Sequence, residues 1–425
     1  MIAKISISQI KKLGKNIRRG LRNGEKPSEE SLELLQNYRV QHQEALRSTF
    51  DFLVQKSKIH YKGSLVVYRL KRIDTIIRKI KRYPTMDLSK MQDIAGCRTI
   101  VNSVNQIYNI VEEFKQSEGF DVLDTDDYIK DIRDTGYSCV HIVVKPKESS
   151  NPVEIQIRTQ TQHHWATLVE ITDLLFGIKL KEGQDHPDLY NFHRLLAKSR
   201  DSELTIEEMA DLVRLDRKHS LIFKITNLFK SNYYQSLRRW MKSLEINKDN
   251  SYLLMELDDS LSPFFSFFET FEIAEMEYFK KFSHAEPEMV LIHMNKPDFG
   301  KLGLAYSNYV LTSHPSVRKY LGILRILICE YKKEQHPQFK ELHKYYQELI
   351  FQIKTSFNSE LDYMNGVLSR KSQLSETYIK LIVEWRDNLS ERIVFLTQKD
   401  ESFKEKLENT EPKFKIRKFW KWLNS

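Results

Sequence analysis

The chain has 425 residues, of which 40% are apolar, and a formal net charge of +9 at pH 7. This length allows two or three domains, and the apolar share, with only 13 Gly and 11 Pro, excludes a disordered chain and favours a largely helical one. Its 3 cysteines are widely spaced, and no apolar run reaches the ~18–20 residues of a membrane span. We therefore expect a cytoplasmic protein with no membrane contact and no disulfide framework, and the positive charge favours a polyanionic partner such as nucleotides or RNA.

The first 60 residues are predicted to form helices. Basic residues interleave with Ile and Leu over residues 5–21, which indicates a short basic helix. Ser28, followed by Glu29 and Glu30, is a typical helix start, and apolar residues then recur at helical spacing to about Gln55. A second, long helix is therefore expected to end near that residue.

A basic run follows, where a predicted strand or turn at residues 66–72 leads into a helix that continues to Lys81. Positive side chains beside the free N–H groups of a helix N-terminus bind phosphate groups well. A solvated basic face is the alternative for such a run, but an acid at the distance of Asp93 favours a phosphate site. The candidate phosphate-binding residues are Arg69, Lys71, Arg72 and Thr75.

Two acidic residues, Asp93 and Glu154, each stand at one end of a short apolar run. Asp93 precedes residues 94–101, and Glu154 begins the alternating stretch 154–159, which places Glu154 and Arg158 on one face of a strand. Two such strands can present both carboxylates to one cleft. Because Mg²⁺ is usually held by one or two carboxylates together with substrate phosphates, the pair indicates a metal-dependent phosphoryl or pyrophosphoryl transferase. A solvated acid at a strand end is the alternative for either residue alone.

The surrounding pattern predicts a mixed sheet with helices around it. Residues 106–114 have their apolar side chains on one helical face, and an edge strand starts after them. A polar loop at 126–136 precedes two alternating strands, 137–144 and 153–159. The expected fold class is therefore α+β, with a nucleotidyltransferase-like mixed sheet in a first domain that covers residues 1–200.

The second domain, residues 201–425, is expected to be a mainly helical accessory or regulatory region. Within it, strands at 252–257 and 289–294, separated by a helix over 267–281, indicate a small α/β module at about 220–320 with a parallel strand pair. Two basic aromatic stretches, Arg238–Lys242 and Lys413–Lys421, would bind an RNA backbone or a partner protein, or simply pack.

Several short motifs, taken in order, resemble the synthetase domain of the RelA/SpoT family. They are Arg-Leu-Lys-Arg (69–72), Asp-Ile-Ala-Gly-Cys-Arg (93–98), Asp-Tyr-Ile (127–129), Gly-Tyr (136–137), His141 and Glu-Ile-Gln-Ile-Arg-Thr (154–159). The resemblance covers roughly residues 60–175. It implies a Mg²⁺-dependent enzyme with ATP and GDP or GTP as substrates, which transfers pyrophosphate from ATP to the ribose 3′-hydroxyl and makes the alarmone (p)ppGpp.

The resemblance also implies roles for individual residues. Asp93 would be the Mg²⁺ ligand, while Glu154 would either complete the metal site or take the proton of the 3′-hydroxyl, and both roles stay open. Arg69 and Lys71 would hold ATP, with Thr75 in place of the family's usual Ser. The remaining assignments are Arg72 and Arg98 near ATP, and Arg133, Tyr137, His141 and Arg158 near the acceptor, where Tyr137 would stack on a purine. Structural roles remain alternatives for four of them: Arg98, a half-buried Tyr137, a core His141, and Arg158 as the partner of Glu154.

The loop over residues 132–141 departs from the family pattern, because the usual Pro, Asn and Gln are absent while Arg133 keeps a positive charge. Acceptor identity is therefore open between GDP, GTP and the 3′ end of tRNA, which toxin-type relatives modify. A non-catalytic nucleotide or RNA sensor is a third hypothesis, although a binder has no need of both Asp93 and Glu154. The family's hydrolase half carries a His-Asp dipeptide, which this sequence lacks, so no hydrolase activity is expected.

Overall fold

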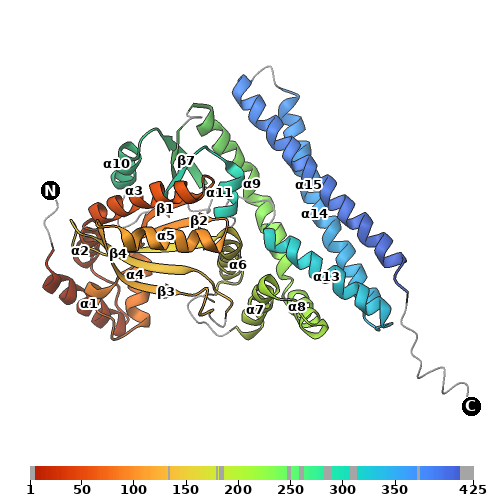
Figure 1. Ribbon diagram of the computed structural model, residues 1–425, viewed down its shortest axis with the longest axis horizontal. Coiled ribbons are helices and arrows are strands. Elements are labelled where there is room, and N and C mark those ends of the chain that lie inside the picture. Colours follow the sequence, from red (N-terminus) through yellow and green to blue (C-terminus); the bar gives the residue numbers. More distant parts are fainter. Residues whose placement is uncertain are drawn as a thin grey trace, which may run out of the picture. The chain divides into compact units, whose positions relative to one another are not determined.

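The computed structural model describes residues 5–132, 135–178, 180, 186–246, 250–257, 263–281, 289–306, 314–370 and 374–411. The fold class is α+β, as predicted: an eight-stranded mixed sheet has helices beside it, and the C-terminal half is mostly helical (Figure 1). The chain forms two compact units. Unit 1 contains Met1–Arg133, Tyr137–Ala166 and Gln235–Tyr309, and unit 2 contains Asp134–Gly136, Thr167–Tyr234 and Val310–Ser425.

The sheet lies entirely in unit 1. Its strands are β1 (Leu65–Leu70), β2 (Ala95–Val101), β3 (Phe120–Asp127), β4 (Val140–Pro146), β5 (Val153–Thr159), β6 (Tyr252–Leu257), β7 (Pro263–Phe268) and β8 (Met289–Met294). Their order across the sheet is β3-β4-β5-β2-β1-β8-β6-β7. Neighbouring strands are antiparallel, except that β2 and β5 are parallel.

Helices of unit 1 surround this sheet. They are α1 (Ile7–Arg22), α2 (Glu29–Val40), α3 (Gln43–His60), α4 (Ile73–Arg82), the 3-10 turn η1 (Leu88–Lys90), α5 (Val104–Gln116), α10 (Phe271–Lys281) and α11 (Phe299–Ala305). The helix predicted to run to about Gln55 is in fact two helices, because the chain breaks at Gln41 and His42 between α2 and α3. The buried ring of His42 contacts the carbonyl oxygen of Tyr38 at 3.0 Å, so it serves packing rather than ligand binding.

The prediction of a small α/β module with a parallel strand pair is wrong. Strands β6 and β8 exist where they were expected, but β8 pairs with β1, so both extend the main sheet. They are antiparallel because the intervening strand β7, which the sequence analysis missed, reverses the chain direction once more. Residues 235–309 accordingly belong to unit 1, and the units do not follow the expected division after residue 200.

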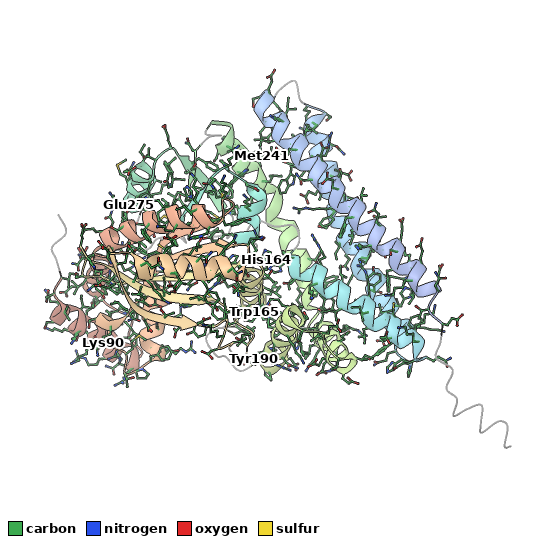
Figure 2. All side chains as sticks on the ribbon, in the orientation of Figure 1. Lys90, His164, Trp165, Tyr190, Met241 and Glu275 are labelled. Carbon is green, nitrogen blue, oxygen red and sulfur yellow. The ribbon has the colours of Figure 1, made fainter. Side chains whose placement is uncertain are left out.

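One face of the sheet is buried against α3, α5 and α10. The shared core includes Phe50 of α3, Phe114 of α5 and Phe271 of α10, together with alternate residues of the strands. On α10, the carboxylate of Glu275 (labelled in Figure 2) is fully buried, accepts a hydrogen bond from the Tyr68 hydroxyl at 2.7 Å, and pairs with Arg47. A helix from residues 271–281 therefore covers strand β1, far away in the sequence.

A second core joins α1, α2 and α4 to the segment before β2. It contains Ile17 of α1, Ile80 of α4, and Ile94, which directly follows Asp93. Gly14 permits the close approach of α1 to η1, since a Cβ atom there would lie 2.8 Å from the Cβ of Leu88. This core fixes α4 beside Asp93.

Unit 2 is helical in its described part. It contains α7 (Pro187–Asp201), α8 (Ile206–His219), α13 (Pro315–Lys333), α14 (Phe339–Leu368) and α15 (Glu376–Glu408), while α6 (Gln160–Phe176) and α9 (Leu221–Ile246) each contain a boundary between the units. Asp400 joins α15 to α14, because it accepts hydrogen bonds from Lys354 at 3.0 Å and from Tyr346 at 3.1 Å. Among the described residues, no helix combines the length and the apolar character needed to cross a membrane.

Because the sheet is continuous, a substitution in its shared core should destabilise strands from both parts of the sequence. Phe271 is buried, and its ring centroid lies 5.0 Å from that of Phe50 and 5.7 Å from that of Tyr68. Phe271→Ala should lower the free energy of unfolding by about 3–5 kcal/mol, measured by urea unfolding, because it leaves a cavity in the shared core. Amide hydrogen exchange should accelerate in β1 and β2 as well as in β6.

Ile273→Ala is the matched control, since Ile273 is on the same helix but 44% exposed, and its effect should stay within about 0.5 kcal/mol. If Phe271→Ala exposed only residues 252–294 to exchange and left β1 and β2 protected, the strands would behave as a separate module, contrary to this fold.

Candidate active site

The candidate site lies on the face of the sheet opposite α3, α5 and α10. The pairing of the strands determines which side chains lie together on this face. Arg69 of β1 lies opposite Gly96 of β2, which lies beside Glu154 of β5. One step further, Arg98 lies beside Gln156, and Gln156 lies opposite His141 of β4. Directly paired residues point to the same side of a sheet. We call Arg69, Arg98, His141, Glu154, Gln156 and Arg158 the polar face.

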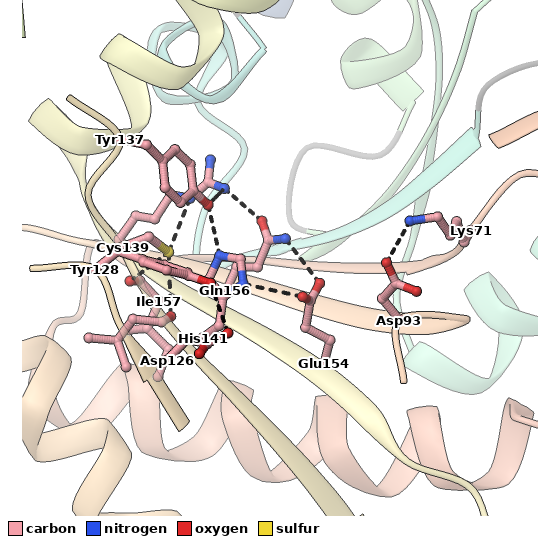
Figure 3. A network of polar contacts seen from close by, with 12 residues as sticks. Lys71, Asp93, Asp126, Tyr128, Tyr137, Cys139, His141, Glu154, Gln156 and Ile157 are labelled. Atoms are coloured by element: carbon pink, nitrogen blue, oxygen red, sulfur yellow. Dashed lines mark hydrogen bonds and ion pairs between the residues drawn. The ribbon is translucent and has the colours of Figure 1, made fainter. Parts of the chain in front are cut away.

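Asp93 lies just before β2, at the same end of the sheet as the start of β5. Its Oδ2 atom accepts hydrogen bonds from the ammonium groups of Lys71 and Lys79, each at 2.7 Å (Lys71 is shown in Figure 3). Burial alone would raise the pKa of Asp93, but the two ammonium groups outweigh it and hold the pKa below its usual value. Asp93 is therefore a carboxylate at neutral pH.

The second oxygen of this carboxylate makes no hydrogen bond to a described residue. Asp93 Oδ1 is buried and has no hydrogen-bond partner among the residues that the structure describes. An ionised carboxylate with a free oxygen fits the ligand preference of Mg²⁺, which takes oxygen donors and often only one or two carboxylates. No group of three or more His, Cys, Asp or Glu side chains in the described chain could hold a metal by itself. The other ligands of a metal bound at Oδ1 would be water or substrate oxygens.

Lys79 was missed by the sequence analysis. It lies one helical turn after Thr75 on α4, so spacing of four residues along the basic helix is the signal that could have identified it. Its contact with Asp93, however, depends on the packing of α4 against residues 91–94 through the second core. That packing is not visible in the sequence.

The other predicted phosphate ligands lie around the start of α4. The backbone N–H of Lys71 donates to the carbonyl oxygen of Ile94 at 2.8 Å, which brings Lys71 to Asp93. Arg72 is the N-cap residue of α4 and makes no side-chain cap, while the hydroxyl of Thr75 accepts from Arg78 at 3.0 Å. Lys71, Arg72 and Thr75 are thus gathered at one helix start. Arg69 lies on the polar face, and Arg133 lies outside the described residues.

Glu154 belongs to a second cluster on the polar face (Figure 3). Its carboxylate lies 3.2 Å from Nδ1 of His141 and accepts a hydrogen bond from Gln156 Nε2 at 3.0 Å. Burial alone would raise the pKa of Glu154, but His141, Gln156 and the charge of Arg69 lower it to about 2. Burial alone would lower the pKa of His141, but its hydrogen bonds with Cys139 and Glu154 raise it above its usual value. The two side chains therefore form a carboxylate–imidazolium pair.

Tyr137 and Arg158 continue this network. The hydroxyl of Tyr137 lies 2.7 Å from Nε2 of His141 and accepts a hydrogen bond from Arg158 Nη2 at 2.7 Å. Arg158 Nη2 also donates to Gln156 Oε1 at 2.8 Å, so Gln156 connects Arg158 with Glu154. The Arg158 guanidinium lies over one face of the Tyr137 ring, 5.2 Å from its centroid. Arg158 is thus tied to Glu154 indirectly, through an amide that the sequence analysis did not single out.

The rings of this network pack against Tyr128, which directly follows β3, and against Trp165 of α6. Tyr128 stands edge-on to Tyr137 and to His141, with ring centroids 5.7 and 5.3 Å apart, and donates its hydroxyl to Asp126 at 2.8 Å. Trp165 approaches the Tyr137 ring edge-on at 6.0 Å. His141 is therefore no isolated core histidine; it is the central member of a hydrogen-bonded chain from Glu154 to Tyr137.

The His141–Glu154 pair predicts a pH-dependent stability. Because the folded pKa of His141 is raised above the unfolded value of about 6.5, its contribution is complete below that pH and is lost as the pH rises through the folded pKa. Glu154, with a lowered pKa, contributes above its unfolded value of about 4.3 and loses this as the pH falls towards 2. Their joint contribution is greatest between these unfolded values.

His141→Gln should therefore lower the free energy of unfolding by about 1–3 kcal/mol near pH 5.5, measured by urea titration. The difference from the unaltered chain should shrink steadily at pH 7, 8 and 9. An equal difference at all of these pH values would show that no imidazolium is involved.

Comparisons with known proteins agree on one region. Residues 68–176 match the family model described as a region found in RelA / SpoT proteins. GTP pyrophosphokinase YjbM of Bacillus subtilis (strain 168) is 32% identical over 131 residues, which are 29% of this chain and 60% of that protein. GTP pyrophosphokinase YwaC of the same organism is 30% identical over 139 residues, 29% of this chain and 66% of that protein. The chain thus spans less than two thirds of either relative.

Two solved structures from Bacillus subtilis also align with the chain. Small alarmone synthetase 1 bound to its product pppGpp has 24% identity and a TM-score of 0.35, over 44% of this chain and 95% of that one. Small alarmone synthetase 2 has 23% identity and a TM-score of 0.33, over 44% and 98%. Residues 68–176, which contain Asp93, His141 and Glu154, thus match the region found in RelA / SpoT proteins, and the two sequence relatives are consistent with this match.

Proposed function

We propose that this chain transfers pyrophosphate from ATP to the ribose 3′-hydroxyl of GDP or GTP and so makes (p)ppGpp. The observation that carries the proposal is the pairing of two ionised carboxylates with different partners at one end of the sheet: Asp93 with two lysines, and Glu154 with His141. The first cluster suits a polyphosphate with its metal, and the second suits a hydroxyl acceptor. The two curated relatives named GTP pyrophosphokinase support this assignment.

The donor half of the site would bind ATP. Lys71 and Lys79, which are 18% and 29% exposed, would exchange part of their contact with Asp93 for the phosphate oxygens, and Arg69 adds positive charge from the polar face. Asp93 would hold Mg²⁺ through Oδ1, and this ion, when bound, polarises the phosphate oxygens. Positioning and charge neutralisation account for most of the catalysis in phosphoryl-type transfer, and these cations supply both.

The acceptor half would bind the guanosine nucleotide. Glu154 stays ionised at neutral pH and would accept the hydrogen bond of the 3′-hydroxyl. It would take the hydroxyl proton as the 3′-oxygen bonds to the β-phosphorus of ATP, while the bond from that phosphorus to the α–β bridging oxygen breaks and AMP leaves. A carboxylate with so low a pKa is a weak base, which suffices because the transition state of such transfers is loose and asks little of the base. The ring of Tyr137 would stack on the purine.

A tRNA acceptor finds less support. In the basic stretch 238–242, Trp240 and Met241 are buried, and Arg239 lies over the Phe264 ring at 3.6 Å. Within residues 238–242 only Arg238 and Lys242 are exposed, so this stretch offers two exposed charges to an RNA backbone. The other basic stretch, Lys413–Lys421, lies outside the described residues. A nucleotide acceptor is therefore the stronger proposal.

The full chain should be incubated with Mg²⁺, ATP labelled in its terminal phosphate, and GDP, GTP or total tRNA in separate reactions. Label should appear in guanosine tetra- or pentaphosphate. Asp93→Asn, which removes the charge with little change of shape, should reduce the transfer rate at least about 100-fold, the usual cost of losing one transition-state electrostatic contact.

Asp121→Asn is the control, because Asp121 is 45% exposed and pairs only with Lys145 among the described residues. It should transfer label at the unaltered rate. Label on tRNA alone would replace the nucleotide acceptor with RNA. Undiminished transfer by Asp93→Asn would remove Asp93 from the site, and bound ATP without transfer to any acceptor would favour the sensor.

Tyr137→Ala should separate the two halves of the site. Loss of the ring removes a stacking contact of about 1–3 kcal/mol, so the KM for GDP should rise roughly 5- to 150-fold. The KM for ATP should change less than twofold. An equal rise of both values would show that Tyr137 supports the whole site rather than the acceptor.

A further inference from the structure

Asp93 has an oxygen that could bind a metal, but the two lysines on its other oxygen surround it with positive charge. One carboxylate oxygen is shared by two ammonium groups at 2.7 Å, so the cluster of Asp93, Lys71 and Lys79 carries a net charge of one positive unit. A free divalent cation that approaches Oδ1 meets this positive cluster. Oδ1 is thus an oxygen ligand of the kind that a divalent cation prefers, while the net positive charge of the cluster repels a free cation.

We propose that Lys71 and Lys79 form a clamp that closes Asp93 to free divalent cations and opens only when nucleotide phosphates draw an ammonium group away. The metal then enters together with the nucleotide. This inference rests on the proposed function, since it takes ATP as the nucleotide that reaches the two lysines.

Lys79 is the member of the clamp that is better suited to move. Its side chain is 29% exposed, against 18% for Lys71, and it leaves an α-helix whose neighbouring residues Ile76 and Ile80 are fully buried. The helix therefore stays in place while a flexible side chain exchanges one anion for another. Lys71 is additionally tied through its backbone N–H to Ile94, at 2.8 Å.

Exchange of this kind couples two ligands thermodynamically. With the ammonium group of Lys79 on a phosphate, Asp93 regains negative charge for the metal, and the metal in turn attracts the phosphates. By linkage, nucleotide must then tighten metal binding by the same factor as metal tightens nucleotide binding. Removing Lys79 should reduce this factor. The affinity for free metal should rise, and the further gain in metal affinity on adding nucleotide should become smaller.

The test uses the full chain, Mn²⁺ as the metal probe, and α,β-methylene-ATP as a nucleotide that cannot be cleaved at the reacting bond. Bound Mn²⁺ is measured by electron paramagnetic resonance with and without the nucleotide. The Lys79→Met variant should bind free Mn²⁺ at least tenfold more tightly than the unaltered chain. The gain in Mn²⁺ affinity on adding the nucleotide should be at least tenfold smaller.

Lys81→Met is the matched control. Lys81 is an exposed lysine on the same helix, so this variant removes the same charge without touching Asp93, and it should bind Mn²⁺ as the unaltered chain does. In the double variant Asp93→Asn with Lys79→Met, the improved binding of free Mn²⁺ should disappear. Circular dichroism confirms that each variant is folded, and Lys79→Gln repeats the test if Lys79→Met is not.

Unchanged or weaker binding of free Mn²⁺ by Lys79→Met would overturn the clamp, as would an equal gain in Lys81→Met. Failure of the proposed function looks different. If the nucleotide does not bind the unaltered chain with or without Mn²⁺, ATP is not the donor, while the comparison of free Mn²⁺ binding between the variants still decides whether the lysines close Asp93.

Discussion

Parallel pairing of β2 with β5 is the constraint on which the candidate site depends. It brings the starts of two strands, some 60 residues apart in sequence, to one end of the sheet, with Gly96 beside Glu154 and Asp93 just before β2. A shift of this register by one residue would turn Glu154, Gln156 and Arg158 into the core and expose Ile155 and Ile157. Burial of the opposite face against α3, α5 and α10 therefore also fixes the polar face.

The two carboxylates are kept ionised by different means, and this difference matters for their chemistry. Asp93 is held by two flexible lysines, which can exchange it for phosphate oxygens, and its second oxygen is left for a cation. Glu154 is held by an imidazolium and an amide that are themselves fixed by neighbouring rings and by Arg158. In the proposed function, the donor half of the site would therefore be adaptable and the acceptor half more rigid.

Much of this site could be predicted from the sequence, because alternation in residues 154–159 shows directly which side chains share a face. The contact of Lys79 with Asp93 could not be predicted, since it depends on how α4 packs against residues 91–94 through the second core. Strand β7 was missed because its residues, Pro-Phe-Phe-Ser-Phe-Phe, hardly alternate in polarity. Its outer carbonyl groups are instead satisfied by Ser243 and Arg239 of α9, a contact that no local pattern announces.

The central claim is that the polar face directs a ribose 3′-hydroxyl at ATP. In the most direct measurement, the full chain is incubated with ATP labelled in its terminal phosphate and with either GDP or 3′-deoxy-GDP. These two acceptors differ only in the 3′-hydroxyl. We predict label transfer to GDP and none to 3′-deoxy-GDP, with similar binding of both nucleotides. Equal labelling of the two, or label released from ATP without any dependence on the acceptor, would contradict the account.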